Sequence, residues 1–137
     1  MTQLIVLGAV LTACAAFGFW RRVQDGKSKT IVSGEVLTAA EIGAPLVADV
    51  TLVQFSSAFC APCRATRVLL ERTAEIVPGV EHIEIDAEAN LELVRKLDVR
   101  RTPTTILLDA KGQVRNRVVG VPQQDALLAA IAVVAGK

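Results

Sequence analysis

Residues 55–64 read Phe-Ser-Ser-Ala-Phe-Cys-Ala-Pro-Cys-Arg and separate two thiols, Cys60 and Cys63, by two residues. The residues before them, 50–56, form a short apolar run with several β-branched side chains, which predicts a strand. Residues 65–77 contain no Gly or Pro and repeat apolar side chains at helical spacing, which predicts a helix. The cysteine pair is therefore expected where a strand passes into a helix.

Cys60 falls at the expected start of this helix. Unpaired backbone N–H groups and the positive end of the helix dipole stabilise a thiolate there. Pro62 fits this position because proline is tolerated in a first helical turn, and Arg64 adds a nearby cation. We therefore expect Cys60 to be an attacking sulfur, and Cys63, one turn further in, to be a more buried resolving sulfur.

Paired cysteines also bind zinc or form structural disulfides. A zinc site normally takes four nitrogen or sulfur ligands, and the remaining candidates are Cys14, within an apolar run, and the single histidine, His82. A purely structural disulfide would close a very small loop and gain little stability from loop entropy. We therefore expect redox chemistry, with no metal and no cofactor other than the Cys60–Cys63 pair.

Further along the chain stand Thr102-Pro103-Thr104, a hairpin with Gly112, and Val119-Gly120 before a last helix. Together with the aromatic-Cys-x-Pro-Cys-Arg run between strand and helix, this combination of motifs, from about Glu35 to the C-terminus, resembles the thioredoxin family. The resemblance implies a thioredoxin fold, an α/β domain with a mixed central sheet flanked by helices. It also implies thiol–disulfide exchange with protein disulfides, and re-reduction by a thioredoxin reductase or another thiol donor.

Pro103 stands at the mouth of a predicted strand, where proline cannot donate to a central ladder. From the residues alone an ordinary trans turn is favoured, since only about 5% of X–Pro bonds in folded proteins are cis. In thioredoxins the matching proline is cis and lies against the sulfurs, so the resemblance implies a cis Thr102–Pro103 bond with the Thr102 backbone contacting substrate. Phe55 is expected in the core. We assign the substrate-binding surface to Phe59, Ala61, Pro62, Thr102, Gly120 and Val121.

Two positions depart from the family pattern in ways that matter for proton transfer. Thioredoxins usually have a buried aspartate six residues before the first cysteine, whereas this chain has Gln54, which cannot take a proton. The next strand usually supplies a lysine nearby, and His82 takes its place by alignment. Because histidine titrates near neutral pH, His82 is a candidate acid–base group. The alternative is a solvated side chain on the same strand face as Glu84 and Asp86.

Other segments carry local signals of secondary structure. Thr38 and Glu41 have the spacing of a capping box, which predicts a short helix that stops near Gly43. Strand, helix and strand over residues 50–86 imply parallel pairing through a right-handed crossover. We also expect a helix over residues 91–97, a hairpin turn at residues 109–112 and a final helix over residues 123–134.

The N-terminal residues 4–20 form a run of 17 residues without a charge. This is the lower edge of what spans a hydrocarbon core of ~30 Å at ~1.5 Å per residue. The run ends in Trp20-Arg21-Arg22, an interfacial aromatic followed by cations, and it lacks the polar stripe of a buried soluble helix. We predict a transmembrane helix or anchor over residues 1–20, with a cleaved segment as the alternative.

Basic side chains gather just after the apolar run. Residues 21–34 have a net charge of +3, and the chain from residue 35 onward has −2, which together give the overall +1. The resemblance suggests a membrane-anchored thioredoxin-like protein of a bacterium. By the positive-inside rule, we expect a single-pass protein of the cell membrane with its catalytic domain in the cytoplasm. Against this, Leu11-Thr12-Ala13-Cys14 resembles a lipoprotein cleavage box, which would put lipid on Cys14 and the domain outside.

The predicted organisation has three parts: the anchor, a basic flexible linker over residues 21–34, and a thioredoxin-like domain over residues 35–137. Glycine and serine between residues 24 and 34 indicate the linker. The domain is slightly acidic and has no surface pattern of aromatic and basic residues, so the sequence gives no indication of nucleic-acid binding.

Three functions fit these features, and we favour the first. It is a membrane-tethered reductase of protein disulfides that works through a mixed disulfide. The second is an extracytoplasmic disulfide oxidoreductase of envelope or cytochrome maturation. The short connection from Cys63 to Val80 counts against it, whereas Thr102, where thioredoxins more often have isoleucine, leaves the redox direction open. The third is a non-catalytic adaptor, which Gln54 keeps open, whereas the presence of both cysteines and of Pro103 argues against it.

Overall fold

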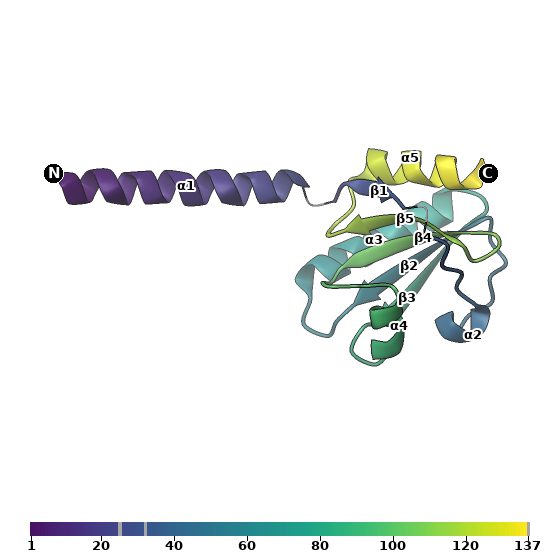
Figure 1. Ribbon diagram of the computed structural model, residues 1–137. Coiled ribbons are helices and arrows are strands. Elements are labelled where there is room, and N and C mark those ends of the chain that lie inside the picture. The colour runs from purple at the N-terminus through teal and green to yellow at the C-terminus, as the bar shows by residue number, and fades with distance from the viewer. Residues whose placement is uncertain (25, 32, 137) are drawn as a thin grey trace.

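The computed structural model describes residues 1–24, 26–31 and 33–136. A five-stranded mixed sheet lies at its centre in the order β1-β5-β4-β2-β3, with β2 and β3 parallel and the other neighbours antiparallel (Figure 1). This confirms the expected thioredoxin fold and the parallel crossover. The strands are β1 (Ser28–Thr30), β2 (Val50–Ser56), β3 (Val80–Asp86), β4 (Thr104–Asp109) and β5 (Val114–Val119).

Helices cover both faces of this sheet. Because side chains alternate along a strand, β2 directs Val53 and Phe55 to one face and Val50 and Leu52 to the other. The first face packs against α2 and α4, and the second packs against α3 and α5. The helices are α1 (Thr2–Gln24), α2 (Ala39–Ile42), α3 (Ala61–Ile76), α4 (Leu91–Lys96) and α5 (Gln124–Ala135).

Local sequence signals placed most of these elements. The Thr38 hydroxyl accepts the backbone N–H of Glu41, and the Glu41 carboxylate accepts the backbone N–H of Thr38 at 2.9 Å, so the predicted capping box is present. Gly43 ends α2 in the left-handed conformation with φ of 75°. The predicted strand over residues 80–86, the hairpin and the last two helices are confirmed to within one or two residues at their ends.

The expected flexible linker is wrong for much of its length. The α1 helix runs on to Gln24, and the Gly26 backbone N–H donates to the Val119 carbonyl at 2.8 Å. The strand β1 then pairs antiparallel with β5, with Lys29 opposite Arg117. Composition missed this because the pairing uses the open edge of a strand some 88 positions away along the chain. Residues 25 and 32 of the expected linker lie outside the described residues.

The N-terminal helix α1 has 23 residues, none of them buried in the rest of the chain. At ~1.5 Å per residue it is ~34 Å long, enough for a hydrocarbon core of ~30 Å. It is thus a candidate membrane span by length and composition, a test that a signal sequence near the N-terminus also passes. Cys14 lies on this helix and is exposed.

Asp109 organises the turn between β4 and β5. Its carboxylate accepts the backbone N–H groups of Lys111 at 2.9 Å and Gln113 at 3.0 Å, and also the Arg115 Nε–H at 2.8 Å. Burial alone would raise the pKa of Asp109, but these hydrogen bonds outweigh it and lower the pKa below the ordinary 3.8. The folded state therefore favours the ionised carboxylate.

Replacing Asp109 by Ala is expected to lower the free energy of unfolding at pH 7 by about 2 kcal/mol, because three donors in partly buried hydrogen bonds lose a charged acceptor. A lowered folded pKa gives stability that is fully present above the unfolded value of 3.8 and is lost as the pH falls through the folded value. The difference between wild type and variant should therefore shrink below pH 3.8. Urea unfolding of the full chain in mild detergent measures this difference at neutral and at strongly acidic pH. An equal difference at the two pH values would contradict the role given to the ionised Asp109 carboxylate.

Candidate active site

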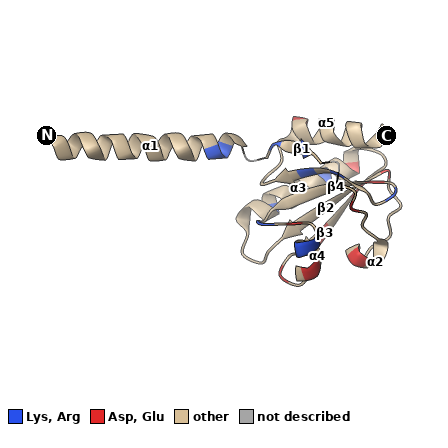
Figure 2. Cartoon of the chain, viewed as in Figure 1, with Lys and Arg blue, Asp and Glu red and all other residues tan. Residues whose placement is uncertain are grey.

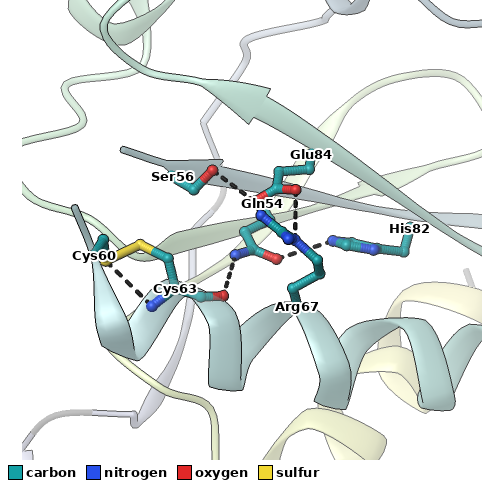
Figure 3. Close-up of polar contacts among 7 residues, drawn as sticks. All are labelled: Gln54, Ser56, Cys60, Cys63, Arg67, His82 and Glu84. Atoms are coloured by element: carbon teal, nitrogen blue, oxygen red, sulfur yellow. Dashed lines mark hydrogen bonds and ion pairs between the residues drawn. A yellow bond between two sulfur atoms is a disulfide. The ribbon is translucent and has the colours of Figure 1, made fainter. Parts of the chain in front are cut away.

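The cysteine pair lies at the junction of β2 and α3, as predicted. Cys60 is the N-cap of α3, and the Cys63 backbone N–H donates to the Cys60 Sγ at 3.2 Å (Figure 3). Pro62 occupies the first turn of the helix. The two sulfurs are joined in a disulfide. Cys60 is half-buried, whereas Cys63 is only 2% exposed, so an incoming group reaches Cys60 first.

The start of α3 gives Cys60 the environment of a nucleophile. A backbone donor already points at its sulfur, and a helix of 16 residues places the positive end of its dipole there. Both features favour a negative charge on Cys60 once the disulfide is reduced. The exposed Arg64 lines the same surface hollow as Cys60 and adds a cation.

The hollow on one side of the disulfide brings together most of the predicted substrate-binding residues. The Thr102–Pro103 bond is cis, as the family resemblance implied. The Pro103 carbonyl accepts the Gly120 backbone N–H at 2.8 Å, and the Thr102 hydroxyl lies 3.0 Å from that of Ser57. The residues lining this hollow, called here the catalytic groove, are Arg22, Pro62, Arg101, Thr102, Pro103, Gly120, Val121 and Gln123.

Phe59 and Ala61, also predicted to bind substrate, lie in a second hollow on the α3 and β3 side of Cys60. Phe59 is 102% exposed, whereas Phe55 is fully buried, as expected for a core side chain. This second hollow includes two residues that sequence reasoning did not assign to the site, Arg67 and Glu84.

Arg67, Glu84 and Ser56 form a connected polar group beside the cysteines (Figure 3). The Glu84 carboxylate accepts a hydrogen bond from the Arg67 Nη2 at 2.8 Å and one from the Ser56 hydroxyl at 2.7 Å. Burial would raise the pKa of Glu84, but the hydrogen bonds from Arg67 and Ser56 lower it overall. The sequence signal that could have identified Glu84 is the alternation of side chains along β3, which puts Glu84 on the same face as His82.

Gln54 and His82, the two departures from the family pattern, contact each other. Gln54 is fully buried, and its Nε2 donates to the Cys63 carbonyl at 2.9 Å. This contact turns the Gln54 Oε1 toward the His82 Nε2, 3.0 Å away. Because an amide oxygen only accepts, the His82 Nε2 carries a proton and donates it to this bond. The contact between the two positions is thus present, and the alternative of a merely solvated His82 is wrong.

Burial lowers the pKa of His82 below its ordinary 6.5, with smaller and partly opposing effects from neighbouring charges. The imidazole is therefore neutral at neutral pH. In Figure 3 it lies on the far side of Gln54 from the two cysteines, and the described hydrogen bonds reach Cys63 through the Gln54 amide. Since that amide does not take up a proton, the arrangement suits positioning better than direct proton transfer.

The chain is similar to known proteins in both sequence and structure. The family model described as Thioredoxin matches residues 36–133. Thioredoxin H5 of Oryza sativa is 30% identical over 74 residues, 54% of each chain. The thioredoxin of Chlamydia trachomatis is 24% identical over 94 residues, 69% of this chain and 91% of that protein. The first of the curated relatives, from plants and fungi, are matched over only about half of their own length.

Solved structures agree with this. A mutant thioredoxin from Halobacterium salinarum superposes with a TM-score of 0.59 and 31% identity, covering 64% of this chain and 76% of that one. The short form of thioredoxin f from spinach chloroplast gives a TM-score of 0.60 and 25% identity, covering 80% and 95%. The similarity of fold therefore covers 64% of the chain in the first of these structures and 80% in the second.

Proposed function

The chain belongs to the thioredoxin family, and from that premise we propose that it is a thiol–disulfide oxidoreductase, tethered to a membrane by α1, that reduces protein disulfides through Cys60 and Cys63. The observation that carries the proposal is the arrangement of the pair. Cys60 is reachable at a helix start with a backbone N–H aimed at its sulfur, and Cys63 is buried within bonding distance behind it.

The reaction starts from the reduced pair. The Cys60 thiolate attacks one sulfur of a client disulfide, and the other client sulfur leaves as a thiolate that takes up a proton. The Cys63 thiolate then attacks the Cys60 sulfur, which releases the second client thiol and forms the Cys60–Cys63 disulfide. The client gains two electrons, and a thioredoxin reductase or another dithiol donor returns them to the enzyme.

Client binding falls to the catalytic groove. The backbone at Thr102 and the exposed Val121 flank Pro62 and Pro103 there, and an extended client segment fits against such a surface by backbone pairing and apolar contact. On the other side, Phe59 offers an exposed aromatic ring next to the reacting sulfur.

Reduction of insulin by the full chain in mild detergent, with a dithiol as electron donor, tests the proposal. We expect insulin to precipitate much faster than with the dithiol alone. The Cys14→Ser variant is the matched control, because it removes the thiol on α1 and leaves the pair intact, and it should keep full activity. If the wild-type chain precipitates insulin no faster than the dithiol alone, the protein is a non-catalytic adaptor and the proposal is wrong.

The side of the membrane is a separate expectation. Because Arg21, Arg22, Lys27 and Lys29 follow the apolar run, we expect the domain in the cytoplasm, where thiols are kept reduced and the pair works as a reductant. A reporter active only in the cytoplasm, fused after residue 137, should be active in bacterial cells. Activity of an exported reporter instead would favour the extracytoplasmic oxidoreductase.

His82 is, in this proposal, a positioning residue that acts through Gln54. Its neutral imidazole holds the Gln54 amide so that the amide donates to the Cys63 carbonyl. A hydrogen bond contributes about 1 kcal/mol net, so His82→Ala should slow the attack of Cys63 on the mixed disulfide roughly fivefold. Stopped-flow release of a coloured thiol from a Cys60 mixed disulfide measures this step.

Two further readouts separate this role from a general loss of stability. The wild-type rate should change with pH below 6.5, where His82 gains a proton, and His82→Ala should lose that change. The effects of His82→Ala and Gln54→Leu should also be less than additive, because both remove the same chain of contacts. Additive effects, or an unaltered pH profile, would return His82 to a structural role.

A further inference from the structure

The connection between the N-terminal helix and the domain is very short. The α1 helix ends at Gln24, and two positions later the Gly26 N–H is bonded to the Val119 carbonyl of β5. Two such positions lie at most ~7 Å apart along an extended chain. The domain therefore has little freedom to move away from the end of α1.

Gly26 fits closely against the segment that follows β5. Its φ of +78° is one that side-chain-bearing residues rarely adopt, and a Cβ there would lie 2.3 Å from the Val121 carbonyl oxygen. From Ser28 onward, β1 continues the attachment along β5. The segment that directly follows α1 is thus fixed to the domain by backbone hydrogen bonds.

This attachment lies beside the catalytic groove. Gly120, between the two residues that meet Gly26, donates its N–H to the Pro103 carbonyl. Arg22, from the last turn of α1, lines the same groove as Pro62 and Pro103. Figure 1 shows α1 leaving the domain near the start of β1, and Figure 2 shows the basic residues of α1 gathered at the end nearest the domain.

Membrane insertion of α1 would set the height of this groove. Trp20, Arg21 and Arg22 are the residue types that lie at the headgroup level, so Arg22 marks the boundary between lipid and water. A groove that Arg22 lines then lies at that boundary too. The fully exposed Phe59 and the 40% exposed Val121 add apolar surface around the reacting sulfur, as suits a lipid interface.

We propose that the catalytic groove faces the membrane surface, and that its client is a disulfide in an extended segment of another membrane protein, close to where that protein enters the bilayer. This rests on the proposed function and specifies its substrate class. The electrons move as described above: the client cystine is reduced to two thiols, and Cys60 and Cys63 are oxidised to the disulfide. A soluble client would have to enter between the domain and the lipid.

A single-turnover experiment on the full chain tests this. The protein is reconstituted in vesicles of phosphatidylethanolamine and phosphatidylglycerol, reduced with a dithiol, and freed of excess reductant. One disulfide-bridged peptide is offered in three forms: soluble, on a lipid through a spacer of about two residues, or on a lipid through about thirty flexible residues. At equal surface density, we expect reduction of the short-spacer form to be roughly tenfold faster than the long-spacer form, because its local concentration at the groove is higher.

The control variant carries a flexible Gly-Ser insertion of about twenty residues after Gln24. It leaves the cysteine pair and the groove residues of the domain in place and frees only Arg22, on α1, from the groove. It should lose the preference for the short spacer and reduce the soluble peptide at least as fast as wild type. Equal rates for the three peptides, or a preference unaltered by the insertion, would overturn the membrane-facing groove while the proposed function stands. If neither the wild type nor the insertion variant reduces any of the peptides, in vesicles or in detergent, the proposed function is wrong and this inference falls with it.

Discussion

Replacing Cys60 by Ser is expected to slow the reduction of client disulfides by roughly a thousandfold or more, as the loss of a catalytic nucleophile usually does. A serine hydroxyl is not ionised at neutral pH and does not form a mixed disulfide. The insulin assay measures the loss directly. Because Cys60 is half-buried at the surface of the domain, its replacement should leave the fold unchanged, as circular dichroism would show.

The Cys63→Ser variant provides the comparison. It keeps the attacking sulfur but loses the group that releases the client, so it should also turn over poorly while accumulating a stable mixed disulfide. Non-reducing electrophoresis would show the adduct with Cys63→Ser and none with Cys60→Ser. An adduct that forms equally well in Cys60→Ser would assign the attack to one of the two remaining thiols, Cys14 or Cys63.

The second large effect concerns stability. Phe55, the second-to-last residue of β2, is fully buried in the core, so Phe55→Ala is expected to lower the free energy of unfolding by about 3–5 kcal/mol through lost burial and the cavity left behind. A loss of that size is a large fraction of the total stability of an ordinary domain. Urea unfolding of the full chain in mild detergent measures it.

Phe59→Ala is the matched control, since it makes the same chemical change four positions away on a side chain that is 102% exposed. Its effect on stability should stay within about 0.5 kcal/mol, as for most surface substitutions. Similar losses for the two variants would mean that the burial pattern of β2 is wrong.

Much of the site followed from local sequence. A β-branched run, two thiols with a proline between them and a helix-forming segment are contiguous, so their order alone predicts a cysteine at a helix start. The capping box of Thr38 and Glu41 is equally local. The cis bond before Pro103 is different, because the residues alone favoured a trans turn and only the family resemblance implied the observed isomer.

The features that sequence reasoning missed depend on contacts between distant segments. The Arg67–Glu84 pair joins α3 to β3, and β1 pairs with β5 across most of the chain. Arg22 is similar: its position after an apolar run predicts a membrane-flanking cation, but its place in the groove depends on where β1 is attached. Nothing in the local composition of residues 21–34 carries that information.

The pairing of β1 with β5 matters for anyone who would prepare the domain in soluble form. Removing the chain up to Glu35 discards β1 and leaves the backbone of Asn116, Arg117 and Val118 as a bare strand edge. Such an edge is a template for pairing with a second molecule, so we expect the truncated domain to form dimers or aggregates more readily than the intact protein. A cut placed between the end of α1 and Gly26 keeps β1, and so keeps the edge of β5 paired.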